Sequence, residues 1–72
     1  MNKATANVVR AIEELYGIDV ESRVLIGSKR NFFTFCTDGM EENDFNNVQR
    51  FANEHGMRNE PAGYKKFAIF FK

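Results

Sequence analysis

The sequence predicts a two-layer α+β fold in the order α-β-β-α-β-β, with two helices on one face of a four-stranded antiparallel sheet. Apolar residues recur at helical spacing in two separate stretches, and each stretch ends at a glycine. Segments rich in β-prone residues follow each helical stretch, with turn residues between them. A chain of 72 residues has room for one small domain, so residues 1–72 are taken as a single unit.

The first half, residues 1–37, predicts a helix followed by a hairpin. The helix is expected to begin after Asn2, a good N-cap, and to end at Gly17. Its apolar stripe is Ala4, Val8, Ala11, Ile12 and Leu15. Residues 20–27 predict one strand and residues 32–37 a second, because both segments are rich in β-branched or aromatic residues. A turn at residues 27–31 would join the two strands.

The second half, residues 38–72, begins with another predicted helix. Asp38 and Glu41 have the spacing of a capping box, and Gly56 is expected to end the helix. Its apolar stripe is Phe45, Val48, Ala52 and His55, with Phe51 beside them. The two halves resemble each other weakly, which leaves two interpretations open: an internal duplication, or two ordinary helix-plus-hairpin units.

Two further strands are predicted after this helix. Residues 57–60 are short and polar, so they are expected to form only an edge strand. Residues 60–63, with proline second and glycine fourth, predict a turn. Residues 64–72 then predict a strong, Phe-rich strand.

Alternation along the two Phe-rich strands predicts apolar side chains on both faces of the sheet. In residues 32–37 and 64–72, one set of alternate positions is Phe33, Phe35, Phe67, Ile69 and Phe71. The other set is Phe32, Thr34, Cys36, Ala68 and Phe70. Because two helices on one side cover only one face, one of these sets is expected to be exposed.

Three interpretations of the second face remain open at this stage. Helix ends, loops and long basic stems could cover it, a protein or a second copy could bind it, or nucleic-acid bases could stack on it. For the second and third interpretations, the candidate binding residues are Lys29, Arg30, Phe32, Thr34, Lys65, Lys66 and Phe70. Residues 65–72 match the RNP1 pattern of RNA-binding sheets at three positions, but Lys66, Ile69 and Lys72 depart from it.

The chain is predicted not to be an enzyme and to hold no metal or other cofactor. Cys36, its one cysteine, lies mid-strand, where a small buried thiol is ordinary. His55, its one histidine, precedes a helix-ending glycine, where a cation suits the helix dipole. Glu41, Glu42 and Asp44 resemble a metal cluster only superficially, because consecutive positions on a helix point apart. No phosphate loop, dinucleotide fingerprint or serine elbow is present.

Charge and hydropathy indicate a cytoplasmic protein with no membrane partner. The charges of ten acidic and ten basic residues cancel. The sequence does not start with basic residues followed by an apolar stretch, so a signal peptide is not predicted. The longest apolar run, residues 67–71, is far short of a membrane span. We therefore expect a small regulatory or inhibitory module, of the kind found in phages and mobile elements. It would act through protein contacts of its Phe-rich face, as a homodimer or with another protein; single-stranded nucleic acid is the alternative ligand.

Overall fold

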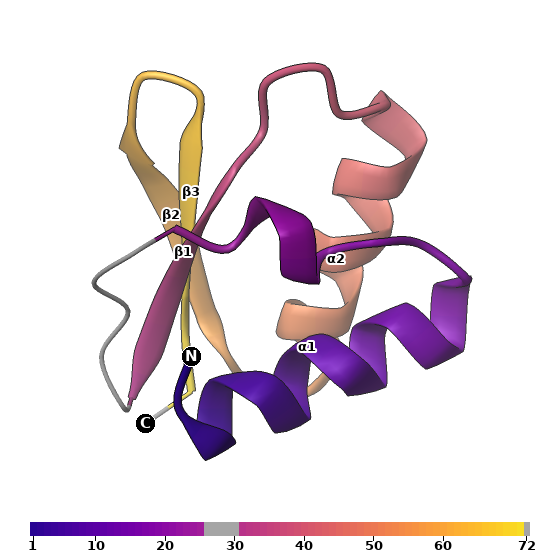
Figure 1. The fold of residues 1–72 in the computed structure, drawn as a ribbon, viewed down its shortest axis with the longest axis vertical. Helices are drawn as coiled ribbons and strands as arrows, with labels where there is room; N and C mark the ends of the chain where they lie inside the picture. The colour runs from indigo at the N-terminus through magenta and orange to yellow at the C-terminus, as the bar shows by residue number, and fades with distance from the viewer. Residues whose placement is uncertain (26–30, 72) are drawn as a thin grey trace.

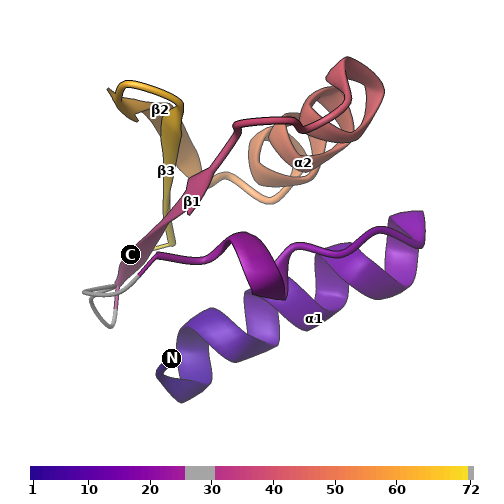
Figure 2. The same ribbon diagram turned by 45° about the horizontal axis from the view of Figure 1, so that its top comes forward.

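Two helices and a three-stranded sheet form two layers in the computed structural model, which describes residues 1–25 and 31–71. The helices are α1 (Lys3–Tyr16) and α2 (Glu42–Glu54), with a short 3-10 helix, η1 (Glu21–Arg23), after α1. The strands are β1 (Phe32–Cys36), β2 (Arg58–Gly63) and β3 (Lys66–Phe70). β3 lies between β1 and β2 and is antiparallel to both. Both helices lie on one side of this sheet (Figure 1, Figure 2).

The α+β class is confirmed, but the predicted four-stranded sheet is wrong, because the sheet of the described residues has three strands. The strand expected at residues 20–27 is replaced by η1 over Glu21–Arg23. After η1, Val24 makes only an isolated bridge to Phe35. Ile26, Gly27 and most of the expected turn lie outside the described residues.

The side chain of Glu13 binds backbone N–H groups that the expected strand needed, and the side chain of Arg23 fixes the segment from within. Glu13 Oε2 of α1 accepts hydrogen bonds from the N–H groups of Val20 and Glu21, each at 2.8 Å. Arg23 Nη1 donates to the carbonyl oxygen of Asp38 at 2.8 Å. The first N–H groups of a helical turn have no partner within the turn, so a carboxylate placed there favours η1 over an extended strand.

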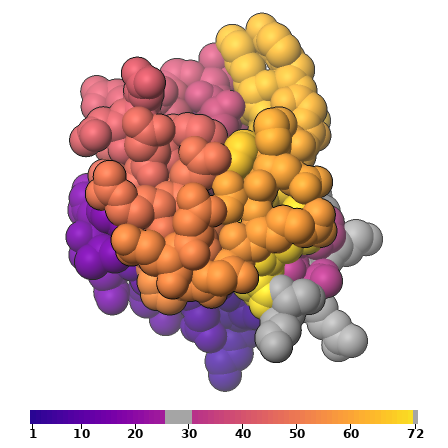
Figure 3. Space-filling view, turned by 180° about the vertical axis from the view of Figure 1, so that it is seen from behind, coloured from indigo at the N-terminus to yellow at the C-terminus, as the bar shows by residue number. Residues whose placement is uncertain are grey.

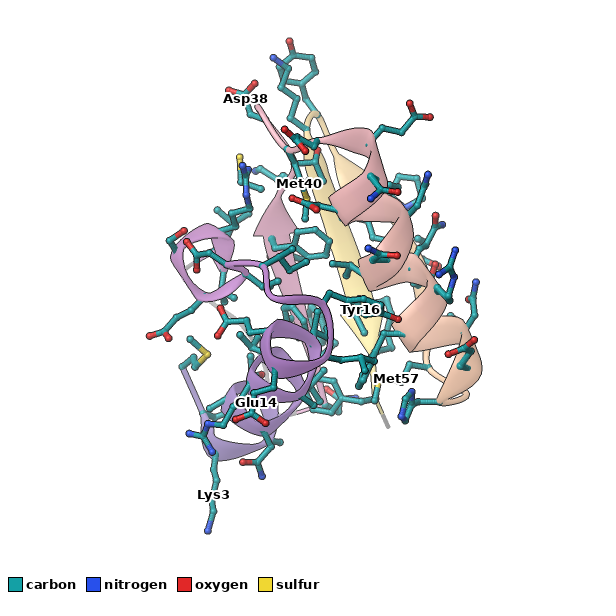
Figure 4. All side chains as sticks on the ribbon, turned by 90° about the vertical axis from the view of Figure 1, so that its right-hand side faces the viewer. Lys3, Glu14, Tyr16, Asp38, Met40 and Met57 are labelled. Carbon is teal, nitrogen blue, oxygen red and sulfur yellow. The ribbon has the colours of Figure 1, made fainter. Side chains whose placement is uncertain are left out.

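The predicted ends of α1 are confirmed, and its predicted stripe is confirmed at Ile12 and in part at Val8, but its other buried positions differ. Asn2 Oδ1 accepts from the Thr5 N–H at 2.8 Å, and Gly17 ends the helix in the left-handed region, with φ 67°. The buried residues are Thr5, Val9 and Ile12, whereas Leu15 is 61% exposed. Tyr16 continues this face and lies between the two helices (Figure 4). The buried stripe therefore runs through Thr5, Val9, Ile12 and Tyr16, and its first member is polar, so a pattern of apolar residues alone does not reveal it.

Replacing Thr5 by valine is expected to stabilise the fold. The Thr5 hydroxyl is buried and has no hydrogen-bond partner among the described residues. An unpaired buried hydroxyl costs about 1–3 kcal/mol, so Thr5→Val should raise the free energy of unfolding by about 1 kcal/mol in urea titrations. Thr5→Ser keeps the hydroxyl but loses the methyl group, and it should be less stable than the wild type. A destabilised Thr5→Val protein would contradict this expectation.

The predicted second helix is present, but its predicted cap is wrong. The N-cap residue is Glu41, which makes no side-chain capping bond, and Asp38 instead forms an ion pair with Lys65 at 2.9 Å. The buried residues Val48, Phe51 and Ala52 confirm most of the predicted stripe. His55 is exposed and is the C-cap residue, so it does not extend the buried stripe.

The hairpin of β2 and β3 confirms the edge strand and corrects the turn. β2 extends through Pro61 to Gly63, so the turn falls at residues 64–65 and not at 60–63. The Phe71 N–H donates to the Asn31 carbonyl oxygen. Because the direction of backbone hydrogen bonds alternates along a strand, the odd-numbered residues of β3 form theirs with β1. Pro61 pairs with the odd-numbered Phe67, so its missing N–H lies on the outer edge of the sheet, where proline is tolerated.

The core lies between the helices and one face of the sheet. Phe33 and Phe35 are fully buried, and the ring of Phe67 lies 6.0 Å from that of Phe35 and 4.8 Å from that of Phe45. Phe67, Ile69 and the partly buried Phe71 join them on this face. The predicted alternation of β1 and β3 is therefore confirmed, and the helices cover the set that contains Phe33.

Candidate functional site

The face of the sheet opposite the helices is the candidate functional site, and we call it the open face. Strand register places its residues in rows across β1, β3 and β2. The first row is Phe32, Phe70 and Arg58, and the second is Thr34, Ala68 and Glu60. The third row pairs Cys36 with Lys66. The open face is thus apolar along its centre, with charged side chains on β2 and at one end of β3.

The first row forms a continuous stack across the three strands. The rings of Phe32 and Phe70 are stacked, with centroids 5.0 Å apart and an interplanar angle of 24°. On the β2 side of Phe70, the Arg58 guanidinium carbon lies 3.9 Å from the ring centroid. Arg58 also donates to Glu60 Oε1 at 3.1 Å, which orients its guanidinium group. Aromatic and cation–π contacts hold the half-buried rings in one arrangement.

A shallow hollow lies beside this stack. Its volume is about 540 Å³, and it is lined by Val24, Leu25, Thr34, Ala62 and Lys66. The Leu25 N–H donates to the Thr34 carbonyl at 3.0 Å, so the segment after η1 forms its wall along β1. Thr34 is the β1 residue that lines it, and Ala68, which pairs with Thr34 on β3, is only 3% exposed.

The structure brings together four of the seven candidate binding residues. Phe32, Thr34, Lys66 and Phe70 all belong to the open face. Lys29 and Arg30 lie outside the described residues. Lys65 lies in the turn between β2 and β3 and not on the open face. Its hydrogen bond to the Asp38 carboxylate raises the pKa of the Lys65 ammonium group above its usual value.

Sequence reasoning missed Arg58, which completes the stack. Its position opposite Phe70 depends on the pairing of β2 with β3, which residues 57–60 alone did not specify. The alternation of Arg58 and Glu60 within that short polar segment was the only signal that both side chains share a face.

Cys36 and His55 lie on different elements and make different contacts. Cys36 is half-buried on the open face, next to Lys66. His55 is at the end of α2, where its ring stacks on Phe51 at 4.0 Å and its Nδ1 atom lies 2.8 Å from the Phe51 carbonyl oxygen. Within residues 1–25 and 31–71, no three His, Cys, Asp or Glu side chains are grouped as metal ligands require.

Comparisons with protein-family models, curated proteins and solved structures find no significant match to this chain. In the described part of the chain, no helix is long and apolar enough to cross a membrane.

Proposed function

We propose that this chain is a small non-catalytic binding module that recognises another protein through the open face. The stack of Phe32, Phe70 and Arg58 is the observation that carries the proposal. Aromatic residues and arginine dominate the binding energy of protein interfaces, and here they form an ordered row beside a shallow hollow. Ordered side chains lose little conformational entropy when a partner binds, which favours affinity.

In the two arrangements with the strands parallel or antiparallel, a second copy bound to the open face would bring like charges together. Two open faces related by a twofold axis parallel to β3 would place Lys66 against Lys66. An axis across the strands would instead bring Glu60 close to Glu60. Arg58 and Glu60 already pair with each other, so among the described residues of the open face Lys66 is the charged side chain without an ion pair. We therefore expect the partner to present an apolar surface with a carboxylate that meets Lys66.

The edges of the sheet also favour binding through the open face over addition of a partner strand. A partner strand could add to the sheet only at β1 or β2. The segment that contains Leu25 already bonds to β1, and Pro61 removes an N–H group from the outer edge of β2. Strand addition is thus disfavoured at both edges, whereas no described helix covers the open face.

Stacking of nucleic-acid bases is the less favoured use of this face. A base would need access to the flat side of an aromatic ring. Phe32 and Arg58 occupy the two sides of the Phe70 ring, at 5.0 and 3.9 Å. Binding of bases at Phe70 would therefore require one of these contacts to break.

Replacing Phe70 by alanine is expected to weaken partner binding at least tenfold, because this truncation removes the centre of the stack. The partner would be isolated from an extract of the source cell with the wild-type chain as bait, and its affinity for the purified chain measured by calorimetry. Leu15→Ala is the matched control, since Leu15 is an exposed apolar residue on α1. It should leave the affinity unchanged.

Two outcomes would contradict the proposed function. The first is an isolated partner that binds Phe70→Ala as tightly as it binds the wild-type chain. The second is binding of a fluorescent mixed-sequence single strand at low salt, with loss of that binding in Phe70→Ala. The second outcome would assign the open face to nucleic acid, and its affinity should then fall steeply with salt.

A further inference from the structure

A groove lies on the helix side of the sheet, between the start of α2 and the β2–β3 hairpin. α2 and the hairpin flank it on the back of the molecule (Figure 3), and Met40 lies beside the start of α2 (Figure 4). Its volume is about 590 Å³, and small-molecule sites commonly have about 300–1,000 Å³. Its apolar lining residues are Met40, Phe45, Pro61 and Phe67. The groove is therefore large enough for a small organic molecule with an apolar body.

Three residues of α2 form one wall of the groove, and each has a different chemistry. Glu42, Phe45 and Gln49 follow each other at helical spacing, so they lie on one face of the helix. They bring a carboxylate, an aromatic ring and an amide to the groove in that order, over two turns or about 10 Å of helix. The Phe45 ring packs edge-on against Phe67, with centroids 4.8 Å apart, which holds the apolar middle of this wall in place.

Glu42 is the charged side chain of the groove that lacks an ion pair among the described residues. Lys65 also lines the groove, but its ammonium group is held by the Asp38 carboxylate at 2.9 Å. Glu60 and Lys66 border the groove as well, but strand register places both side chains on the open face. The groove therefore keeps one negative charge that no cation of this chain neutralises, next to an apolar surface.

The Gln49 amide has an orientation that its neighbours determine. Asn59 Nδ2 donates to the Met57 carbonyl oxygen at 3.2 Å and to Asn53 Oδ1 at 2.8 Å. The Oδ1 atom of Asn59 is therefore the acceptor for Gln49 Nε2, which donates to it at 3.3 Å. The other atom of the Gln49 amide, Oε1, remains as a hydrogen-bond acceptor without a partner among the described residues.

We propose that the groove binds an arylalkylamine, a small molecule with an ammonium group at one end of an aromatic body. The ammonium group meets the Glu42 carboxylate, and the aromatic body lies on Phe45 and Phe67. A hydroxyl group on the far side of the ring donates to Gln49 Oε1. Each part of the ligand matches the group that the α2 wall presents there: cation to carboxylate, ring to ring, and donor to acceptor. An anion of the same shape would be repelled by Glu42.

This site goes beyond the proposed function because it lies on the other side of the sheet. Alternation along β2 sends Arg58 to the open face and places Asn59 and Pro61 at the groove. Phe32 and Phe70 belong to the open face, and neither lines the groove. Loss of one binding activity should therefore leave the other intact.

Titration of the full chain with tyramine, followed by NMR of the backbone amides, tests the site. We expect a dissociation constant on the order of 1 mM, because an open groove binds a ligand of about ten non-hydrogen atoms only weakly. The amide signals of Met40, Phe45 and Gln49 should shift, and those of Phe32 and Phe70 should not. Hydroxyphenylpropionate keeps the ring and the hydroxyl group but carries a carboxylate, so it should bind at least about tenfold more weakly.

Glu42→Gln tests the ammonium contact. It removes the charge and keeps the shape, and it should raise the tyramine dissociation constant about three- to fivefold, the effect of one exposed ion pair. Glu41→Gln is the matched control, because Glu41 is the adjacent exposed carboxylate and does not line the groove. It should change the dissociation constant by less than about twofold, since water and salt screen a charge outside the site.

Gln49→Leu tests the hydroxyl contact. It keeps a side chain of similar size but loses Oε1, so tyramine should bind about fivefold more weakly, the effect of one hydrogen bond. Phenethylamine has the same ring and ammonium group without the hydroxyl, and its affinity should be the same for Gln49→Leu and the wild type. Circular dichroism of each variant verifies that it is folded.

Four results would overturn the proposal. The first is a wild-type spectrum without shifts at about 10 mM tyramine, a concentration that fills most sites of millimolar affinity. The second is hydroxyphenylpropionate that binds as tightly as tyramine. The third is an equal effect of Glu42→Gln and Glu41→Gln, which would show only a general attraction of cations to the start of α2. The fourth is a set of shifts confined to Phe32 and Phe70, which would place the amine on the open face.

Discussion

Replacing Phe35 by alanine is expected to lower the free energy of unfolding by about 3–5 kcal/mol, the usual cost of removing a buried phenylalanine. Phe35 is fully buried at the centre of β1, with its ring 6.1 Å from that of Phe33 and 6.0 Å from that of Phe67. The truncation leaves a cavity within this aromatic cluster, and a core of so few residues has little freedom to close it. Small domains have only about 5–15 kcal/mol of stability, so this single truncation should remove a large share of it.

Phe32→Ala is the matched control, because Phe32 belongs to the same strand but points to the open face. It loses the stacking on Phe70 and part of its burial, so we expect a loss of about 1 kcal/mol. Urea unfolding followed by circular dichroism measures both variants. Equal losses for Phe32→Ala and Phe35→Ala would contradict the assignment of the two faces.

Replacing Glu13 by alanine is expected to cost about 2 kcal/mol, since hydrogen bonds to a charged group contribute about 1.5–3 kcal/mol. Glu13 Oε2 accepts from the N–H groups of Val20 and Glu21, both at 2.8 Å, and Val20 is fully buried. Water can replace the Glu13 carboxylate as the acceptor for the exposed Glu21 N–H, but it reaches the N–H of the buried Val20 poorly. The loss of stability should therefore be greatest in the segment where α1 is followed by η1.

Glu14→Ala separates this role from a general effect of charge. Glu14 is the next residue on α1 and is exposed, so its replacement should change stability by less than about 0.5 kcal/mol. Hydrogen exchange of the Val20 amide gives a local measurement, and this amide should exchange faster in Glu13→Ala than in Glu14→Ala. Similar stability and exchange in both variants would show that Glu13 does not hold η1.

Much of the open face was predictable from sequence, because alternation along a strand is a local property. Phe32, Thr34 and Phe70 were correctly placed together on one face, opposite Phe33 and Phe35. The pattern could not say which of the two faces the helices cover. Arg58 could not be identified either, because its position beside Phe70 depends on the pairing of β2 with β3.

The sequence by itself determined the two helices, the strands β1 and β3 and the edge strand β2, because caps, apolar periodicity and alternation act over a few residues. The tertiary structure decided what happens to residues 20–25. A local preference for extended backbone there was overridden by Glu13 on the preceding helix and by contacts of Arg23 with the carbonyl oxygens of Cys36 and Asp38. The groove lined by Met40, Phe45, Pro61 and Phe67 likewise exists only because α2 and the hairpin meet in space, where Asp38 and Lys65, 27 residues apart, form a hydrogen bond. Contacts over such separations depend on how the elements pack, which a local pattern of residues does not encode.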